Sequence, residues 1–161
     1  MVYVGIDPGA SGGYAALYPD GVIGFHSFAD SEAQRWDQMR MLALQDRPFA
    51  VIEEIHGSFQ GSSKGSVAKL YGSYTALRMA MVGLGIPFVA VGAGVWHRAL
   101  GIPPRVRASK KHPERTPEST TEWKNRLKAE AAKRFPRLKV TLATADALLI
   151  ACYCKQVYGN K

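Results

Sequence analysis

Three carboxylates occupy positions in the sequence where their side chains could share metal ions. Asp7 ends the alternating stretch 2–6 and precedes the turn residues Pro8 and Gly9, Glu53 closes an apolar run, and Asp146 opens an apolar helical stretch. Clustered carboxylates repel one another unless divalent cations lie between them, and oxygen ligands of this kind suit Mg²⁺ or Mn²⁺. Two such ions could clamp the attacking water and the leaving oxygen of a phosphodiester.

Each carboxylate also has a plainer interpretation. Asp7 could simply begin an Asp-Pro-Gly turn, and Asp146 could be a favourable first-turn residue of a helix capped by Thr144. Glu53 adjoins Glu54, and neighbouring strand residues face opposite sides of a sheet, so only one of the two can face a site. We expect Glu53 to be that residue.

The elements that must position these side chains follow from hydrophobic periodicity and turn residues. Residues 2–6, 13–18 and 22–28 are predicted strands of an antiparallel meander, because Pro19-Asp20-Gly21 is a strong hairpin signal. Residues 49–55 form an apolar strand that we expect to lie parallel to the first, and 88–91 a fifth strand. Helices are predicted over 31–44, with Trp36, Met39 and Leu42 or Ala43 inward, and over 66–84, 122–135 and 145–158, with a short one after 92–94.

Composition favours one globular domain over residues 1–161, since 47% of the residues are hydrophobic. No apolar run is long enough to cross a bilayer, and the N-terminus lacks the pattern of a signal peptide. The two cysteines, Cys152 and Cys154, suit neither a zinc site nor a disulfide framework. We therefore expect a cytoplasmic protein without a membrane partner.

The positive charge is concentrated in one region. Residues 98–139 hold thirteen Lys or Arg against four Glu, whereas the rest of the chain is nearly neutral. A solvated basic face would explain this, but such a distribution is also typical of phosphate-backbone binding. Within the region, residues 103–121 are predicted to be a mobile basic loop. Candidate nucleic-acid contacts are Arg105, Arg107, Lys110 and Lys111 in that loop and Lys64 in the loop 56–66.

The predicted helix 66–84 is a candidate subunit interface. The small residues Gly72, Ser73 and Ala76 would permit close approach, and Leu70, Leu77 and Met81 would supply apolar area. The alternative is that the whole helix packs on its own sheet.

The three acidic segments together resemble a known family. Gly5-Ile-Asp-Pro-Gly9, Val51-Ile-Glu-Glu-Ile55 and Ala145-Asp-Ala-Leu-Leu-Ile-Ala151 are similar to the acidic signatures of RuvC-like Holliday junction resolvases, in the same order and spacing. Val95-Trp96 and the Lys-rich helix ending in Phe135-Pro136 are similar to phage-type members. The resemblance implies an α/β ribonuclease H-like fold, with a mixed five-stranded sheet flanked by helices.

The same resemblance implies roles for particular residues. Asp7, Glu53 and Asp146 would be ligands of Mg²⁺, with Mn²⁺ as the alternative ion, and Lys124 or Lys128 would assist catalysis. His56 or Phe59, near the second acidic segment, would stack on junction bases. The family usually has a fourth ligand three residues before the last acid, and here that position is Ala143.

The predicted function is metal-dependent cleavage of branched DNA, most of all of four-way junctions, by a homodimer that makes two symmetric cuts. A ribonuclease H-like module that binds branched DNA but cuts weakly is one alternative, and an RNA–DNA hybrid nuclease is another. An actin-like phosphotransferase would need two such domains, so the chain is too short for it.

Overall fold

One mixed β-sheet forms the centre of the protein, for which the computed structural model describes residues 1–9, 11–21, 23–55, 63–108 and 116–159. Within these ranges five strands lie in the order β3-β2-β1-β4-β5. The strands are β1 (Val2–Asp7), β2 (Gly13–Leu17), β3 (Ile23–Ser27), β4 (Pro48–Glu54) and β5 (Phe88–Gly92). β2 lies antiparallel to both β1 and β3, whereas β4 lies parallel to β1 and β5. The predicted meander followed by parallel strands is confirmed.

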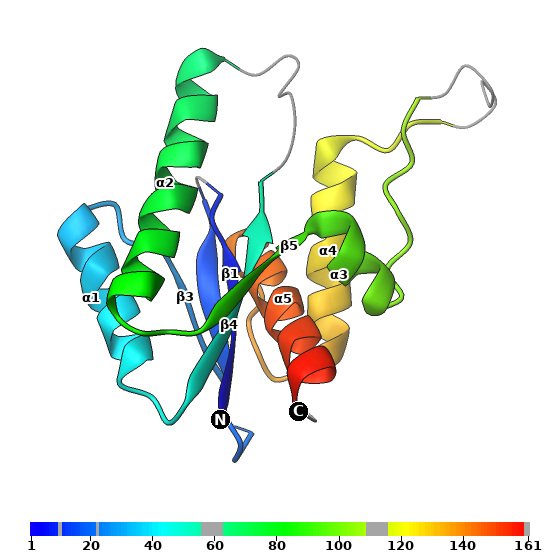
Figure 1. Ribbon diagram of the computed structural model, residues 1–161. Helices are drawn as coiled ribbons and strands as arrows, with labels where there is room; N and C mark the ends of the chain where they lie inside the picture. The colour runs from blue at the N-terminus through cyan, green and yellow to red at the C-terminus, as the bar shows by residue number, and fades with distance from the viewer. Residues whose placement is uncertain (10, 22, 56–62, 109–115, 160–161) are drawn as a thin grey trace.

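Helices cover both faces of the sheet (Figure 1). They are α1 (Glu32–Ala43), α2 (Lys64–Gly83), α3 (Ala93–Ala99), α4 (Thr120–Arg134) and α5 (Leu142–Tyr158). α1 and α2 lie on one face, α5 lies against the other, and α4 packs outside α5. Among the described residues, no helix combines the length and apolar character that a bilayer span requires.

The alternation of side chains along each strand divides the core into two halves. Val2, Val4 and Ile6 of β1 belong to the half that includes Met39 of α1 and Leu77 of α2. The residues between them therefore point to the opposite face, where α5 supplies more of the buried apolar side chains than any other element. By the same alternation, the last residue of β1 faces the α5 side.

Three helices begin earlier than the sequence predicted. In each case a Ser or Thr further toward the N-terminus is the N-cap. α2 begins at Lys64 behind Ser63, so residues 64–66 are not loop. α4 begins at Thr120 behind Ser119, whose hydroxyl accepts from the Glu122 N–H in a capping box. In α5, Thr144 is not the N-cap, since the helix begins at Leu142 after Thr141.

One inward residue of α1 was also assigned wrongly. Met39 and Leu42 are buried as predicted, but the Trp36 side chain is 46% exposed. Trp36 lies at the margin of α1, where its ring comes within 3.9 Å of the position that a Cβ on Gly83 of α2 would take. It therefore packs beside the adjacent helix and leaves part of the indole open.

The contact between β1 and α5 is unusually close at Gly5. A Cβ built on Gly5 would overlap the backbone nitrogen of Ala151 and the backbone oxygen of Ala147. The absence of a side chain at this position therefore sets how near the α5 backbone can approach the strand.

Replacing Gly5 should test this packing directly. Gly5→Ala should lower the free energy of unfolding by about 1–3 kcal/mol or more, since backbone atoms of α5 must move to admit the methyl group. The matched control is Gly24→Ala in β3, where the new Cβ would meet only the Tyr18 ring at 3.6 Å or more, an ordinary contact. Chemical denaturation measures both. Equal stability of the two variants would contradict the close packing.

Candidate active site

Two acidic side chains meet at the ends of neighbouring parallel strands. β1 and β4 are in register with Ile6 opposite Ile52, which brings Asp7 beside Glu53. Both side chains face α5, because Ile6 and Ile52 point into the other half of the core. Glu54 points the opposite way, toward Tyr74 of α2, whose pKa it helps to raise. The expectation that Glu53, not Glu54, faces Asp7 agrees with this arrangement.

The third carboxylate comes from α5 and is accompanied by a lysine. Asp146 directly precedes Ala147, one of the three α5 residues whose backbone lies against Gly5. Because α5 begins at Leu142, Asp146 lies beyond the first turn of the helix, and its plainer interpretation as a helix-start residue is wrong. Lys124 of α4 is close enough to lower the pKa values of both Asp7 and Asp146.

Burial and mutual repulsion dominate the electrostatics of these acids. Each keeps some accessible surface, yet protein atoms surround most of it. Desolvation first, and the neighbouring acids second, raise the pKa of Glu53 to about 8, and desolvation and Asp7 raise that of Asp146 to about 7. Desolvation also raises the pKa of Asp7, opposed by the N–H of Gly9, which donates to Asp7 Oδ1 over 2.9 Å.

The donor chemistry of this cluster suits a hard divalent cation. Three largely buried carboxylates with one nearby lysine would carry an excess of negative charge when ionised, and a cation such as Mg²⁺ would neutralise it. The three carboxylates lie further apart, however, than the ligands of one bound ion would. Within the described ranges, no three acidic, imidazole or thiol side chains are gathered tightly enough to hold an ion. The residues fit a metal in kind, and their side chains would have to draw together around it.

A cleft of about 670 Å³ opens over Asp7 and Glu53. Its other walls include Leu70 of α2, Gly94 and Val95 of α3, and the exposed Arg98. Arg98 was not predicted as a site residue, although the basic region of the sequence begins with it. The cleft therefore places one cationic side chain opposite the acids, at the edge of the sheet where β1 and β4 end.

Trp96 is a further neighbour of the acids that was not predicted. Its side chain is 1% exposed and lowers the pKa of Glu53 through the indole N–H. That N–H has no hydrogen-bond partner of normal geometry among the described residues, so the contact with Glu53 is a loose one. The Trp96 ring contacts that of His97, with 3.8 Å between the ring centroids and the ring planes tilted by 56°.

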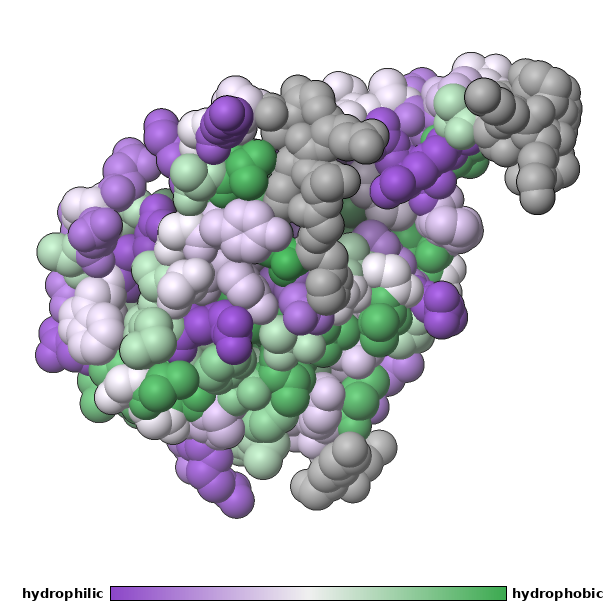
Figure 2. Space-filling model, turned by 45° about the horizontal axis from the view of Figure 1, so that its top comes forward, coloured by the Kyte–Doolittle hydropathy of each residue, from purple (hydrophilic) through white to green (hydrophobic). Residues whose placement is uncertain are grey.

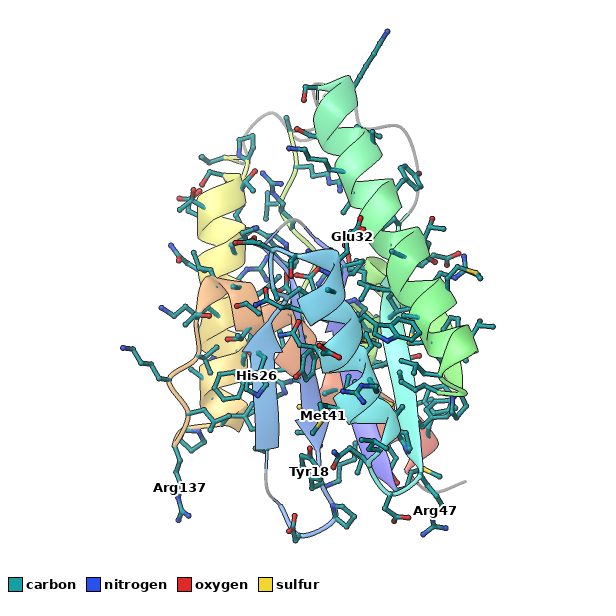
Figure 3. The ribbon with its side chains drawn as sticks, turned by 90° about the vertical axis from the view of Figure 1, so that its left-hand side faces the viewer. Tyr18, His26, Glu32, Met41, Arg47 and Arg137 are labelled. Carbon is teal, nitrogen blue, oxygen red and sulfur yellow. The ribbon has the colours of Figure 1, made fainter. Side chains whose placement is uncertain are left out.

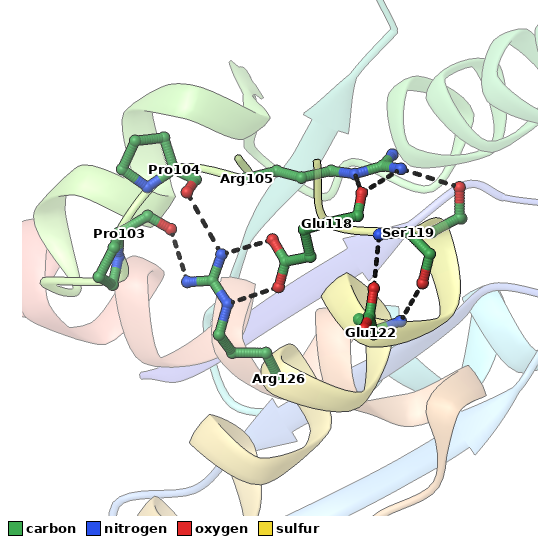
Figure 4. Close-up of polar contacts among 8 residues, drawn as sticks. Pro103, Pro104, Arg105, Glu118, Ser119, Glu122 and Arg126 are labelled. Atoms are coloured by element: carbon green, nitrogen blue, oxygen red, sulfur yellow. Dashed lines mark hydrogen bonds and ion pairs between the residues drawn. The ribbon is translucent and has the colours of Figure 1, made fainter. Parts of the chain in front are cut away.

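An arginine clamp holds the two ends of the basic segment together (Figure 4). Arg126 of α4 donates to both carboxylate oxygens of Glu118, at 3.0 and 2.9 Å, and to the carbonyls of Pro103 and Pro104. Arg105 in turn donates to the Glu118 carbonyl at 3.0 and 2.9 Å. These bonds form a fixed stem between residues 103–108 and 116–119. Figure 2 shows hydrophilic side chains gathered on the arm that carries this stem.

The remaining predicted residues lie in different parts of the structure. Arg105 and Arg107 line a cavity beside the cleft, whereas Lys64 begins α2 and Lys128 lies one turn beyond Lys124 on α4, exposed. Ala143, the position of the expected fourth ligand, lies in the first turn of α5. Four predicted nucleic-acid contacts lie outside the described residues: His56, Phe59, Lys110 and Lys111.

Comparison with known proteins identifies the fold. No family model matches the sequence, and no curated protein sequence matches it significantly. Among solved structures, the chain is similar to T. thermophilus RuvC in complex with a Holliday junction substrate, with a TM-score of 0.61, 16% identity, and coverage of 99% of this chain and 96% of that one. A second Thermus thermophilus RuvC structure gives a TM-score of 0.55 and 19% identity over 99% and 96% of the two chains. The protein therefore has the ribonuclease H-like fold of RuvC, as the sequence predicted.

The raised pKa values predict a stability that falls with increasing pH. Unfolded Glu53 would release its proton near 4.5, whereas the folded protein retains it to about 8. The folded state thus binds more protons between these values, and each pH unit costs stability. In EDTA, Glu53→Gln should leave stability unchanged near pH 4 and raise it by on the order of a few kcal/mol at pH 8.

Glu54→Gln is the control, because Glu54 faces the opposite side of β4. Chemical denaturation at a series of pH values measures the effect. If wild type and Glu53→Gln showed parallel pH profiles, the acids would not be coupled as described.

Proposed function

We propose that the protein is a metal-dependent endonuclease that cuts four-way DNA junctions. The observation that carries this proposal is the convergence of Asp7, Glu53 and Asp146 on one side of the sheet, with Lys124 beside them. Similarity to RuvC bound to a Holliday junction extends over 99% of the chain and supports the choice of substrate. We further propose that Asp7, Glu53 and Asp146 hold Mg²⁺ or Mn²⁺.

The residues of the cluster divide the chemistry between them. Bound divalent metal would supply an activated water and stabilise the charge that develops on the leaving oxygen. Asp7 is close enough to raise the pKa of both other acids, and its hydrogen bond from Gly9 fixes the side-chain orientation. Lys124 offsets negative charge near Asp7 and Asp146, and Arg98 offers a cation to the DNA backbone at the cleft. The basic stem would bind duplex arms mainly through phosphates.

A second candidate function is a branched-DNA-binding module with weak or no cleavage. One ground for it is the spacing of the acids, because no three acidic, imidazole or thiol side chains in the described part of the chain lie close enough together to hold an ion. The other is Ala143, which occupies the position of the expected fourth ligand. Binding and cleavage must therefore be measured separately.

Replacing Asp7 should separate them. Asp7→Asn should reduce cleavage of a labelled four-way junction in Mg²⁺ or Mn²⁺ by more than the roughly 10–100-fold typical of losing an outer partner of a metal ligand. Junction affinity should be unchanged or higher, since the change removes a negative charge near the phosphates. Asp37→Asn, in an exposed i,i+3 pair on α1, is the control.

Linear duplex and an RNA–DNA hybrid serve as competing substrates in the same assay. Wild type that binds junctions and never cuts them would favour the binding module. Preferential cleavage of the hybrid would favour the RNA-directed alternative, and persistent cutting by Asp7→Asn would show that the catalytic centre lies elsewhere.

We also propose a homodimer, because two symmetric cuts are most simply made by two subunits related by a twofold axis. The predicted interface needs correction. Leu77 and Met81 are only 1% and 0% exposed, so they pack on the protein's own sheet and cannot supply interface area. Ser73 accepts a hydrogen bond from Arg35 within the subunit.

The outward face of α2 offers a different apolar surface. Met79 and Val82 are 62% and 61% exposed, and Trp36 lies beside the next residue, Gly83. Gly72 and Ala76 are also exposed, and a Cβ at Gly72 would meet no atom within 4 Å, so this part of the helix is open to the close approach of a second helix. We assign the Trp36–Met79–Val82 surface as the dimer contact.

Light scattering should report about twice the 17.6 kDa of one chain. Met79→Glu should shift the mass to that of a monomer that binds junctions but leaves them nicked once, because a buried charge opposes association. Met41→Glu is the control, since Met41 (Figure 3) is similarly exposed, at 55%, on α1 away from this surface. A monomeric wild type that makes paired cuts would rule the dimer out.

A further inference from the structure

A second cavity of about 520 Å³ adjoins the cleft. Ala93 and Gly94 of α3 line both hollows, and a Cβ at Gly94 would meet no atom within 4 Å. The two hollows are therefore separated by little more than an exposed glycine. A strand that placed one phosphate over Asp7 could continue past Gly94 into the second cavity.

The second cavity is cationic. Arg105 lines it with a guanidinium fixed by its bonds to the Glu118 carbonyl and, at 3.2 Å, to Thr120. Arg107 also lines it, is exposed, and makes no hydrogen bond or ion pair with any residue that the structure describes. Among the described lining residues none is acidic. The Glu118 carboxylate, whose pKa is lowered first by Arg126 and also by Arg105, compensates part of the Arg105 charge, so Arg107 is the less compensated of the two cations.

Aromatic side chains also line this cavity. Trp123 of α4 lines the cavity and is partly exposed. Its ring is held by the guanidinium of Arg126 at 4.4 Å and by an edge-on contact with His97 at 5.0 Å. Desolvation and then Arg126 lower the pKa of His97 to about 4, so this ring is a neutral packing surface at physiological pH. The clamp that fixes the stem therefore also fixes Trp123.

We propose that this second cavity binds the nucleotide next to the scissile phosphate on the same DNA strand. Arg105 and Arg107 bind its phosphate, and Trp123 contacts its sugar or base. Cationic grooves with an aromatic platform bind single strands without reading sequence, because every nucleotide offers a phosphate and an apolar face. The proposal rests on the proposed function for its substrate, but it concerns binding and does not depend on cleavage.

Affinity for a four-way junction, measured in EDTA by anisotropy of a labelled strand, tests the two walls separately. Trp123→Leu should weaken binding by ~5-fold or more, and Trp123→Phe, which keeps a ring, should recover most of it. Arg107→Gln should weaken binding and reduce the slope of log K against log salt by about 1. Arg137→Gln is the matched control, because Arg137 is exposed and points away from the body of the fold near its lower end (Figure 3).

Tryptophan emission gives a second readout in case Trp123→Leu folds poorly. Saturating junction should quench the emission of wild type, and most of that change should be absent in Trp123→Phe at saturation. An equal change in both proteins, or Trp123→Leu and Arg107→Gln that bind as tightly as wild type, would overturn the nucleotide subsite and leave the nuclease proposal standing. A junction bound through Trp123 but never cut would support the subsite and overturn the nuclease.

Discussion

The close approach of α5 to β1 at Gly5 is the contact on which the arrangement of the acids depends. Asp7 lies at the C-terminal end of β1, and the pairing of β1 with β4 brings Glu53 beside it. Neither feature positions Asp146, which is on a helix. Because Gly5 has no side chain, the α5 backbone at Ala147 and Ala151 lies directly against the strand, and the residue before Ala147 is Asp146. A larger residue would push the helix outward and withdraw Asp146 from the other two acids.

The same packing creates an electrostatic requirement. Bringing Asp146 to the strand ends removes water from all three acids, which is why burial is the largest cause of each raised pKa. Lys124 offsets part of this charge near Asp7 and Asp146, and the Trp96 indole offsets a little near Glu53. Apolar side chains in these positions would stabilise the fold more than the acids do. The acids therefore form a destabilising cluster, and a bound cation would relieve their mutual repulsion. Departures of this kind from good packing are expected at functional sites.

The strands of the sheet, and the side of it to which Asp7 and Glu53 point, could be predicted from the sequence because both follow from local periodicity. Alternation along β1 and β4 places Asp7 and Glu53 on one side, and an apolar run indicates an interior strand. Helix starts were placed less well, since Thr144 and Thr141 both offer a hydroxyl and only the three-dimensional contact selects Thr141. Long-range pairs such as Arg126 with Glu118, or Trp123 with His97, leave no periodic signal at all. The burial of Leu77 and Met81 likewise depended on which face of α2 meets the sheet.

The count of basic residues in the sequence does not show which of them are free to bind DNA. Thirteen basic residues between 98 and 139 count equally in the sequence, but the structure uses them in different ways. Arg126 is bound by Glu118 and two prolyl carbonyls, and Arg134 by Glu130 at 3.0 Å and the Leu100 carbonyl at 2.8 Å. These guanidiniums hold the stem and α4 in place, so their charge is largely compensated within the protein. The cations left to meet DNA are those the clamp presents without a carboxylate partner. Arg107 is one of them, and it lines the same cavity as Trp123 because the Arg126–Glu118 ion pair, which the charge count conceals, holds the stem against α4.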